Sequence, residues 1–461
     1  MFLSDTIAAV STPRGKGGIA VIRISGAETV QTVSRIFFPS GGLSPDEYPP
    51  RRALYGVIKD VSGREIDSGM LTLFRAPASY TGEDMAEVSC HGGVYVTREV
   101  LSAVLGAGAR AAEAGEFTRR AFLNGKLTLT EAEAVGELLD ADTEDKMRLA
   151  SSALRGKLSE KISSVAGSLT DIMSALYAVI DYPEEDIEET EEGELAAVLE
   201  NALGEIRRLL STYRRGKAVS SGVKCVICGR PNAGKSSLYN LITGEDSAIV
   251  TDVEGTTRDV LRERVSFGGV TLELCDTAGI RETDDSVESI GVRRAEAEME
   301  KAELLIGVFD SSRPLTDDER AMMDSYPAVS RIAVINKNDL ERRIDDSDVN
   351  FIKEHHDKTV YMSCGTGAGL DELSEYVGEL YDAGSCELGR DAVIWSARHE
   401  AALRRAAEYL EAALSSLIAG DPVDAVCTLC EGALSELSET DGRGVTEDIV
   451  AGIFSKFCVG K

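Results

Sequence analysis

Long apolar runs and a leader-like start are both missing from this sequence. No stretch approaches the about 20 apolar residues of a membrane-spanning helix, and residues 1–5 lack the basic start of a signal peptide. These absences argue against a membrane protein, and we expect no membrane contact and a cytoplasmic location.

Basic residues are scarce relative to acidic ones. The chain has 49 Lys and Arg against 79 Asp and Glu, a formal net charge of -30. This charge repels phosphate backbones, so we expect any contact with RNA to be local. Local basic clusters occur at Arg119, Arg120 and Lys126, and at Arg207, Arg208, Arg214, Arg215 and Lys217, although such residues on helices are usually only solvated.

Cysteine forms no framework. Nine cysteines are scattered along the chain, as in a reducing compartment. Cys225 and Cys228 lie in a predicted strand, where an odd spacing points them to opposite faces. Cys427 and Cys430 share a helix face, but no further Cys or His stands nearby in the sequence. We predict structural roles for both pairs, not metal binding.

With 461 residues the chain is too long for one core, and two to four domains are expected. Residues 1–122 read as an α+β domain. The predicted strands are residues 6–10, 19–25, 53–58, 70–74 and 85–90, and the predicted helices are residues 29–37 and 94–105.

Helical periodicity dominates two later regions. Apolar residues at intervals of three and four predict a long helix or helix pair between 130 and 180, and further helices over 195–210, 403–417 and 426–437. Residues 213–222 and 384–389 read as linkers. We predict an all-α helical-bundle domain, residues 123–218 and 384–461, interrupted by an inserted α/β domain, residues 219–383, with a doubly wound parallel sheet.

A glycine-rich phosphate loop opens the inserted domain. Residues 229–237 read Gly-Arg-Pro-Asn-Ala-Gly-Lys-Ser-Ser between an apolar run and a helix-like segment. Glycines let backbone N–H groups converge on phosphates, Lys235 reaches the β- and γ-phosphates, and Ser236 offers a hydroxyl to Mg²⁺. Because all fixed positions are present, we favour a nucleotide site over an ordinary glycine-rich turn.

Later motifs narrow the nucleotide to GTP. Asp276 ends a predicted strand and opens Asp-Thr-Ala-Gly, where Gly279 can place its N–H on the γ-phosphate. Asp339 can accept from guanine's N1/N2 edge and Lys337 can cover the ring. Residues 363–365, Ser-Cys-Gly, are placed to close over the base. This set resembles the guanine-nucleotide domain of translation-factor-like GTPases.

The water-orienting glutamine of many GTPases is absent, since Ile280 follows Gly279. Acidic residues of the next segment, including Glu288, are candidates for that role, or mere solvated loop charge. Residues 251–259 occupy the position of a switch segment whose threonine meets Mg²⁺. Asn232 offers an oxygen to a monovalent cation that would supply the charge of a missing arginine finger.

Several further motifs together resemble the tRNA-modification GTPases of the MnmE (TrmE) family over essentially the whole chain. They are residues 79–84 (Ser-Tyr-Thr-Gly-Glu-Asp), 90–93 (Cys-His-Gly-Gly), 115–119 (Gly-Glu-Phe-Thr-Arg), 121–126 (Ala-Phe-Leu-Asn-Gly-Lys), 180–187 (Ile-Asp-Tyr-Pro-Glu-Glu-Asp-Ile), 255–259 (Gly-Thr-Thr-Arg-Asp) and 457–461 (Phe-Cys-Val-Gly-Lys).

The resemblance implies a potassium-stimulated GTPase that acts as a homodimer. Glu288 and Lys235 would be catalytic. Magnesium would be held by Ser236 and Thr257, and potassium by Asn232, Thr251, Val253 and Thr256. The positions matching the GTP site are Asn232, Ala233, Gly234, Lys235, Ser236, Ser237, Thr251, Thr256, Thr257, Asp276, Thr277, Ala278, Gly279, Asn336, Lys337, Asp339, Ser363 and Cys364.

It further implies a 5-formyltetrahydrofolate-type one-carbon donor in the N-terminal domain, bound by positions matching Arg23, Glu87, Lys126 and Lys461. With an FAD-dependent partner of the MnmG (GidA) type, such proteins add an aminomethyl-type or carboxymethylaminomethyl-type group at C5 of the wobble uridine of certain tRNAs. Cys458 invites a role in the one-carbon chemistry, although no base stands beside it.

Two other classes stay open. A ribosome-assembly GTPase could share this nucleotide domain, but no second phosphate loop or RNA-binding module follows it. A non-enzymatic nucleotide-gated scaffold could use the long helices to transmit motion.

Overall fold

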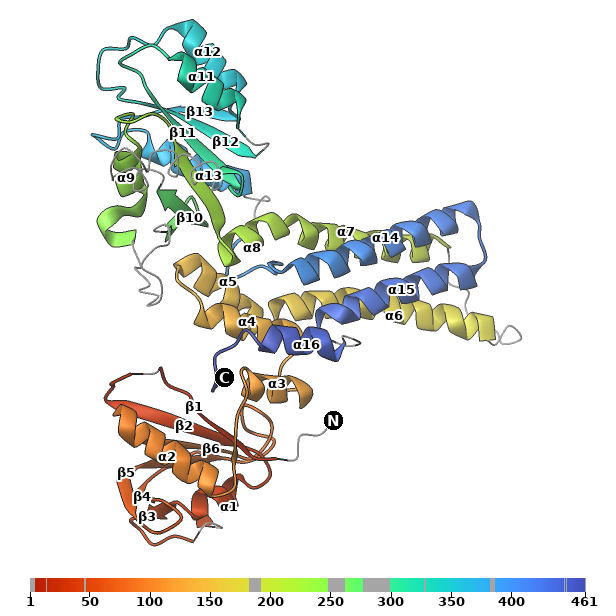
Figure 1. The fold of residues 1–461 in the computed structure, drawn as a ribbon. Coiled ribbons are helices and arrows are strands. Elements are labelled where there is room, and N and C mark those ends of the chain that lie inside the picture. The colour runs from red at the N-terminus through yellow and green to blue at the C-terminus, as the bar shows by residue number, and fades with distance from the viewer. Residues whose placement is uncertain are drawn as a thin grey trace. The chain divides into compact units, whose positions relative to one another are not determined.

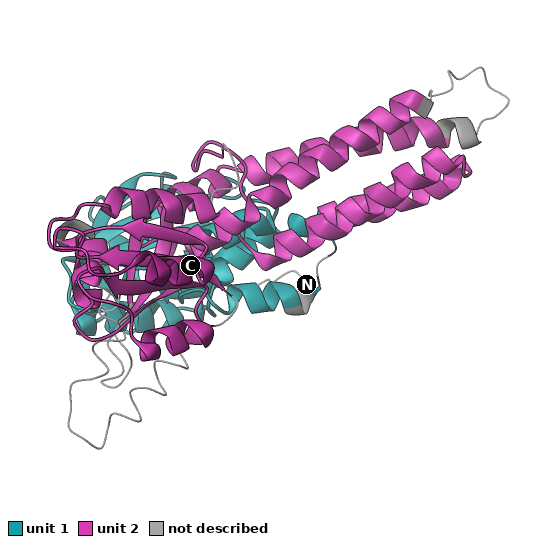
Figure 2. Cartoon of the chain, turned by 90° about the horizontal axis from the view of Figure 1, so that it is seen from above, with its two compact units in different colours: residues 1–136, 438–461 teal, residues 137–437 magenta. Residues whose placement is uncertain are grey.

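A computed structural model describes residues 5–13, 15–44, 47–181, 192–247, 262–276, 299–326, 329–381, 386–442, 444 and 446–460. The chain divides into two compact units (Figure 2). Unit 1 comprises Met1–Gly136 and Ser438–Lys461, and unit 2 comprises Glu137–Leu437. The predicted domain bounds stay predictions, because each unit combines parts of more than one predicted domain.

Unit 1 is built on a seven-stranded sheet in the order β3-β4-β5-β6-β2-β1-β7. Its strands are β1 (Ile7–Val10), β2 (Ile19–Ser25), β3 (Phe37–Pro39), β4 (Ala53–Lys59), β5 (Glu65–Phe74), β6 (Met85–His91) and β7 (Arg110–Ala111). The five predicted strands are present, with β5 beginning earlier than predicted. The first predicted helix ends sooner, as α1 (Thr29–Ser34), because the chain turns into β3.

Side-chain alternation gives this sheet two different faces. Ile22, Ile24 and Val88 belong to one apolar cluster with residues of α2 (Val94–Gly106), which packs across that face (Figure 1). Each such fully buried side chain contributes about 1.5–3 kcal/mol relative to an exposed one. The alternating positions Arg23 and Glu87 therefore lie on the opposite face.

The C-terminal segment belongs to unit 1. Val450 and Phe454 of α16 (Glu447–Phe454) pack with Leu129 and Ala132 of α4 (Leu129–Leu139) in one apolar cluster. The helix α3 (Glu116–Leu123) contacts α16 as well. The extreme C-terminus is thereby held beside the segment that follows the N-terminal sheet.

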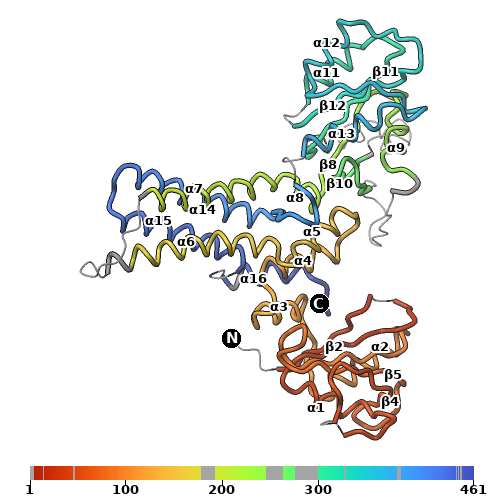
Figure 3. Tube along the Cα trace, turned by 180° about the vertical axis from the view of Figure 1, so that it is seen from behind, coloured from red at the N-terminus to blue at the C-terminus, as the bar shows by residue number. Residues whose placement is uncertain are grey.

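Unit 2 contains a bundle of long helices that lie side by side (Figures 1 and 3). They are α6 (Lys157–Asp181), α7 (Glu192–Ser211), α14 (Ala397–Ala419) and α15 (Val423–Thr440). The helix α7 packs on both α6 and α14, and the hydroxyl of Tyr177 donates to Glu431 at 2.8 Å between α6 and α15. Helices from both sides of the predicted insertion thus form one bundle, as the periodicity indicated.

Two predictions, one of a helix and one of a linker, need correction. Residues 130–180 form three helices, α4, α5 (Glu144–Leu154) and α6, because Thr143 caps α5 and Gly156 at φ +80° separates it from α6. The predicted linker 213–222 is mostly the helix α8 (Tyr213–Ser220). Gly216 lies within this helix, and a Cβ there would lie 2.1 Å from the carbonyl oxygen of Ile394, so the glycine permits close packing.

The inserted α/β domain has a six-stranded sheet in the order β13-β12-β11-β8-β10-β9. Its strands are β8 (Val223–Cys228), β9 (Arg262–Phe267), β10 (Val270–Asp276), β11 (Leu304–Asp310), β12 (Ser330–Asn336) and β13 (Lys358–Tyr361). Apolar clusters on its two faces include residues of α9 (Lys235–Ser247) and α13 (Leu370–Tyr381) on one side. Residues of α11 (Asp317–Asp324) and α12 (Asp346–Glu354) belong to the cluster on the other side. The doubly wound architecture is confirmed.

One strand departs from the predicted parallel order. The edge strand β9 runs antiparallel to β10, and the two are joined at Gly268 and Gly269, both with positive φ. Such a glycine pair favours a tight hairpin turn. The remaining neighbours in this sheet are parallel.

Both cysteine pairs are buried, as their predicted structural roles require. Cys225 and Cys228 belong to clusters on opposite faces of the sheet, and Cys427 and Cys430 are 0% and 1% exposed. Across the described ranges, no three His, Cys, Asp or Glu residues are grouped as metal ligands would be. Within the same ranges, no helix combines the length and apolarity needed to cross a membrane.

Candidate functional site

The phosphate loop connects β8 to α9, and its backbone needs glycine at two points. Gly229 has φ +138°, and a Cβ there would lie 2.4 Å from the carbonyl oxygen of Val308. Gly234 has φ +109°, and its Cβ would lie 2.0 Å from Nδ2 of Asn336. The loop therefore holds a shape that side chains at these positions would prevent.

The side chains predicted to contact phosphate lie at the start of α9. Lys235 donates from Nζ to the carbonyl oxygen of Arg230 at 2.7 Å, so it curls over its own loop. Ser236 and Ser237 are exposed in the first helical turn, where backbone N–H groups and the helix dipole favour anions. Asn232 is exposed with φ +63°.

A buried amide joins the phosphate loop to the predicted base-binding segments. Asn336, 2% exposed, donates from Nδ2 to the carbonyl oxygen of Ala233 at 2.8 Å and accepts at Oδ1 from the N–H of Cys364 at 2.8 Å. It thus ties together the loops that follow β8, β12 and β13. These loops meet at the carboxyl edge of the sheet, where ligands of doubly wound folds bind.

The remaining base-site residues lie at the same edge. Asp339 is exposed, and Ser363 is 3% exposed with a buried Oγ that bonds to no described residue. The structure therefore brings together the predicted positions in residues 232–237, 336–339 and 363–364.

Part of the predicted site lies outside the described residues. Asp276 ends β10, but its side chain is not described. The positions wholly outside are Thr251, Val253, Thr256, Thr257, Thr277, Ala278, Gly279, Glu288 and Lys461. Their assigned roles stay predictions.

The predicted folate residues Arg23 and Glu87 form an ion pair in unit 1. They are direct neighbours on β2 and β6, and Nη2 of Arg23 lies 2.9 Å from Oε1 of Glu87. The Arg23 guanidinium also lies over the ring of Tyr80, 5.6 Å from its centroid. Tyr80 bonds through its hydroxyl to Thr118 at 2.9 Å, and burial raises its pKa. Tyr80, which contacts Arg23, is not among the folate positions that the resemblance implied.

Lys126 and the C-terminal tail, two further segments predicted to bind folate, also belong to unit 1. Lys126 is exposed and donates to the carbonyl oxygen of Pro77 at 3.1 Å. Val459 forms a bridge with Ala114, and the hydroxyl of Ser11 donates to the carbonyl oxygen of Gly460 at 2.9 Å. Cys458 is exposed, and its carbonyl oxygen accepts from the N–H of Gly115 at 3.4 Å.

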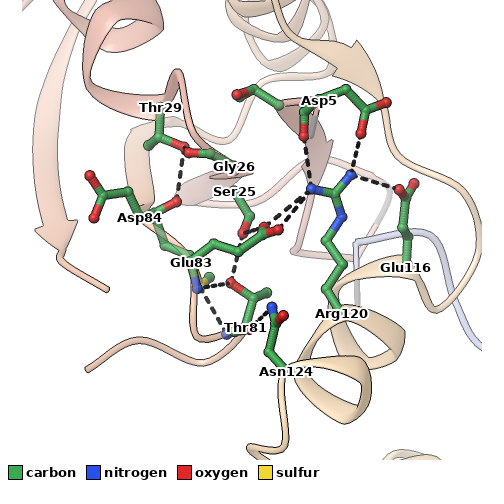
Figure 4. Close-up of polar contacts among 12 residues, drawn as sticks. Asp5, Ser25, Gly26, Thr29, Thr81, Glu83, Asp84, Glu116, Arg120 and Asn124 are labelled. Atoms are coloured by element: carbon green, nitrogen blue, oxygen red, sulfur yellow. Dashed lines mark hydrogen bonds and ion pairs between the residues drawn. The ribbon is translucent and has the colours of Figure 1, made fainter. Parts of the chain in front are cut away.

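A buried ionic network positions these segments (Figure 4). Arg120, 1% exposed, lies within 3.1 Å of carboxylate oxygens of Asp5, Glu83 and Glu116. Ser25 donates to Glu83 at 2.8 Å. The network links the start of β1, the end of β2, residues 79–84 and α3.

Arg120 cannot act as part of an RNA-binding basic cluster, contrary to one sequence-based possibility, because its guanidinium is buried and paired. Three residues of the second possible basic cluster also form ion pairs. Arg207 and Arg208 pair with Glu411 and Glu205, and Lys217 pairs with Glu303. All three side chains remain largely exposed, so these surface ion pairs add little stability and leave the cluster accessible.

The fold and the phosphate loop define a multidomain P-loop GTPase. Residues 6–126 match the family description "GTP-binding protein TrmE N-terminus", and residues 129–458 match "MnmE helical domain". The chain belongs to the MnmE (TrmE) family.

Similar relatives named tRNA modification GTPase MnmE span the whole chain. The protein of Clostridioides difficile (strain 630) is 39% identical over 461 residues, which cover 100% of both chains. That of Geobacillus kaustophilus (strain HTA426) is 40% identical over 459 residues, or 99% of both. That of Geobacillus thermodenitrificans (strain NG80-2) is 41% identical over 459 residues, again 99% of both.

Proposed function

We propose that this protein is a potassium-stimulated GTPase that takes part in modification of the wobble uridine of certain tRNAs. The observation that carries the proposal is the Asn336 bridge, which fixes the phosphate loop against both predicted base-binding segments. Full-length similarity to proteins named tRNA modification GTPase MnmE supports the tRNA substrate.

The phosphate loop fits the two cations of the proposal. The exposed hydroxyl of Ser236, at a helix N-terminus, would be a Mg²⁺ ligand together with Thr257. The exposed Asn232, turned by its positive φ, would share K⁺ with Thr251, Val253 and Thr256. Potassium would supply positive charge at the phosphates, Lys235 would bind them, and Glu288 would orient the attacking water.

The polar face of unit 1 fits a folate-type one-carbon donor. A cation at Arg23 or Lys126 suits the glutamate tail of 5-formyltetrahydrofolate, and the carboxylate of Glu87 suits its amino-pterin edge. Lys461, which follows Gly460 in the chain, is the other proposed folate ligand, and Gly460 itself is bound by Ser11. The exposed Cys458 is the candidate for a role in the one-carbon chemistry.

The proposal includes three macromolecular associations. The face of the unit 1 sheet opposite α2, with exposed Tyr55 and Met70 on neighbouring strands, suits a homodimer contact. An FAD-dependent partner of the MnmG type would complete the modification of C5 of the tRNA uridine. We expect these assemblies in the cytoplasm.

Potassium dependence tests the nucleotide half of this proposal. GTP hydrolysis by the full chain is measured with equal concentrations of KCl or NaCl, for the wild type and for Asn232→Ala. We expect potassium to raise the wild-type rate by about tenfold or more, as removal of one charge-stabilising group commonly costs 10²–10³. Asn232→Ala should lose most of this difference, and equal wild-type rates in both salts would contradict the proposal.

A further inference from the structure

Asp310 ends the central strand β11 beside the predicted guanine site, and no role has yet been given to it. Its register partner on β12 is Asn336, and its side chain is 7% exposed. A buried carboxylate is costly unless it is well paired. The partners of Asp310 therefore indicate why it stands at this position.

One carboxylate oxygen of Asp310 holds the side chain of Lys337. Nζ of Lys337 donates to Oδ2 of Asp310 at 2.7 Å. The other oxygen, Oδ1, accepts from the N–H and hydroxyl of Ser312 at 2.9 and 2.6 Å. Burial acts to raise the pKa of Asp310, but the bonds from Lys337 and Ser312 outweigh it and lower the pKa, so the carboxylate is ionised at neutral pH.

The backbone of Lys337 is fixed from the same strand end. The hydroxyl of Ser311 donates to the carbonyl oxygen of Lys337 at 3.0 Å, and the N–H of Ser311 donates to the carbonyl oxygen of Asn336 at 2.9 Å. Lys337 itself has φ +63°, an uncommon conformation for a residue other than glycine. Such a conformation persists only where its surroundings determine it.

We propose that Asp310 is a positioning residue for guanine-nucleotide binding, acting through Lys337. By holding the ammonium group at the sheet edge, it directs the methylene stem of Lys337 along the place that the base plane occupies. A lysine side chain is otherwise flexible over four carbons. When the Lys337 side chain is held in place before the nucleotide binds, binding loses less side-chain conformational entropy. This inference rests on the assignment of residues 336–339 to the base site.

The test is a double-mutant cycle on the full chain with GDP as the probe, read as a dissociation constant. Asp310→Asn and Lys337→Gln should each weaken GDP binding by about tenfold, the size expected when one partner of a charge-assisted bond is removed. The double variant should bind no more weakly than Lys337→Gln alone, because both changes remove the same interaction.

Ser312→Ala is the matched control, since it removes a hydrogen bond from the other oxygen of Asp310 and leaves the Lys337 pair intact. We expect it to bind GDP like the wild type, and each nucleotide-free variant to remain folded at the temperature of the binding measurement, as its thermal unfolding curve would show. Wild-type affinity in Asp310→Asn, or losses that simply add, would overturn the positioning role. Failure of the wild type to bind GDP would contradict the GTP site itself, and the inference with it.

Discussion

At the scale of single residues, the nucleotide site depends on a contact between a glycine and an amide. Gly234 lies so close to Asn336 that a methyl group at this position would meet Nδ2 at 2.0 Å. The glycine also has φ +109°, which other residues rarely adopt. A side chain at position 234 would therefore disturb both the shape of the phosphate loop and the hydrogen bonds of Asn336.

Gly234→Ala should consequently weaken GDP binding by at least about tenfold, because the strain and the displaced amide together cost on the order of 1–3 kcal/mol. Equilibrium binding of a fluorescent GDP analogue measures the loss. Gly204→Ala in α7 is the control, since the added methyl group meets no described atom within 4 Å beyond its chain neighbours and its own helix backbone, and it should bind like the wild type. Unchanged affinity in Gly234→Ala would contradict the observed loop geometry.

The second residue-scale prediction concerns acid stability of unit 1. Hydrogen bonds from Arg110 lower the pKa of Asp5, and the pKa of Glu116 is lowered by Arg110 and Arg120 although burial opposes it. Lowered pKa values mean that the stabilisation is complete above the ordinary values of about 4 and is lost as the pH falls through the folded-state values. The wild type should therefore lose stability below about pH 4.

Glu116→Gln should destabilise the protein at pH 7 by about 3 kcal/mol, since it leaves Arg120 buried with fewer carboxylates. Its stability should also fall less steeply between about pH 5 and 3. Denaturant unfolding at several pH values measures both effects. Glu113→Gln is the control, because the Glu113 side chain is exposed. If the stability of Glu116→Gln depended on pH as that of the wild type does, the buried ionic network would not explain the loss of stability in acid.

At the scale of elements, the C-terminal tail is attached by backbone contacts. Gly460 has φ +101°, and a Cβ there would lie 2.3 Å from the carbonyl oxygen of Val10. The bridge between Val459 and Ala114 adds a second attachment. The tail position thus depends on a residue with no side chain.

Gly460→Ala should loosen the tail and speed amide exchange at Gly115, whose N–H donates to the carbonyl oxygen of Cys458. Hydrogen exchange followed by NMR or mass spectrometry measures the change, which should be about tenfold for a loss near 1.4 kcal/mol. The methyl group of Gly452→Ala in α16 meets no described atom within 4 Å outside its chain neighbours and helix backbone, so this variant should leave the exchange unaltered. Equal protection in Gly460→Ala would show that the tail is held by other contacts.

Periodicity and turn residues predicted most elements, because strands such as β2 and helices such as α14 bury one regular face. Predictions failed where tertiary packing decided the outcome. Residues 213–222 were predicted to be a linker, yet Ala218 and Val219 are buried in a helix that packs on β10. The edge strand β9 was also missed, although it pairs with the next strand, β10, across the Gly268-Gly269 turn, and such a glycine pair is a local hairpin signal.

The sequence predicted more of the nucleotide site than of the polar face of unit 1. Phosphate-loop residues are consecutive and their chemistry fixes their spacing, so Lys235 and Ser236 could be named directly. Tyr80 and Arg120 act through partners distant in the chain, namely Arg23 and Asp5. Only folding brings such pairs together, so neither role could be read from local pattern.

At the scale of the whole molecule, the chain combines a GTPase domain with helices from both of its flanks. The helices α7 and α14, one before and one after the inserted domain, pack on each other. A nucleotide-dependent change in the inserted domain would therefore reach the bundle through both of its connections. This arrangement fits a GTPase whose hydrolysis serves a reaction elsewhere on the protein, and the tRNA is the proposed site of that reaction.

Mass spectrometry of wobble nucleosides tests this central claim most directly. Transfer RNA is isolated from a strain lacking the gene, and from the same strain supplied with the wild type or with Lys235→Ala. The account predicts aminomethyl-type groups at C5 of the wobble uridine with the wild type, and their loss in the other two strains. Normal modification in the strain that lacks the gene would contradict it.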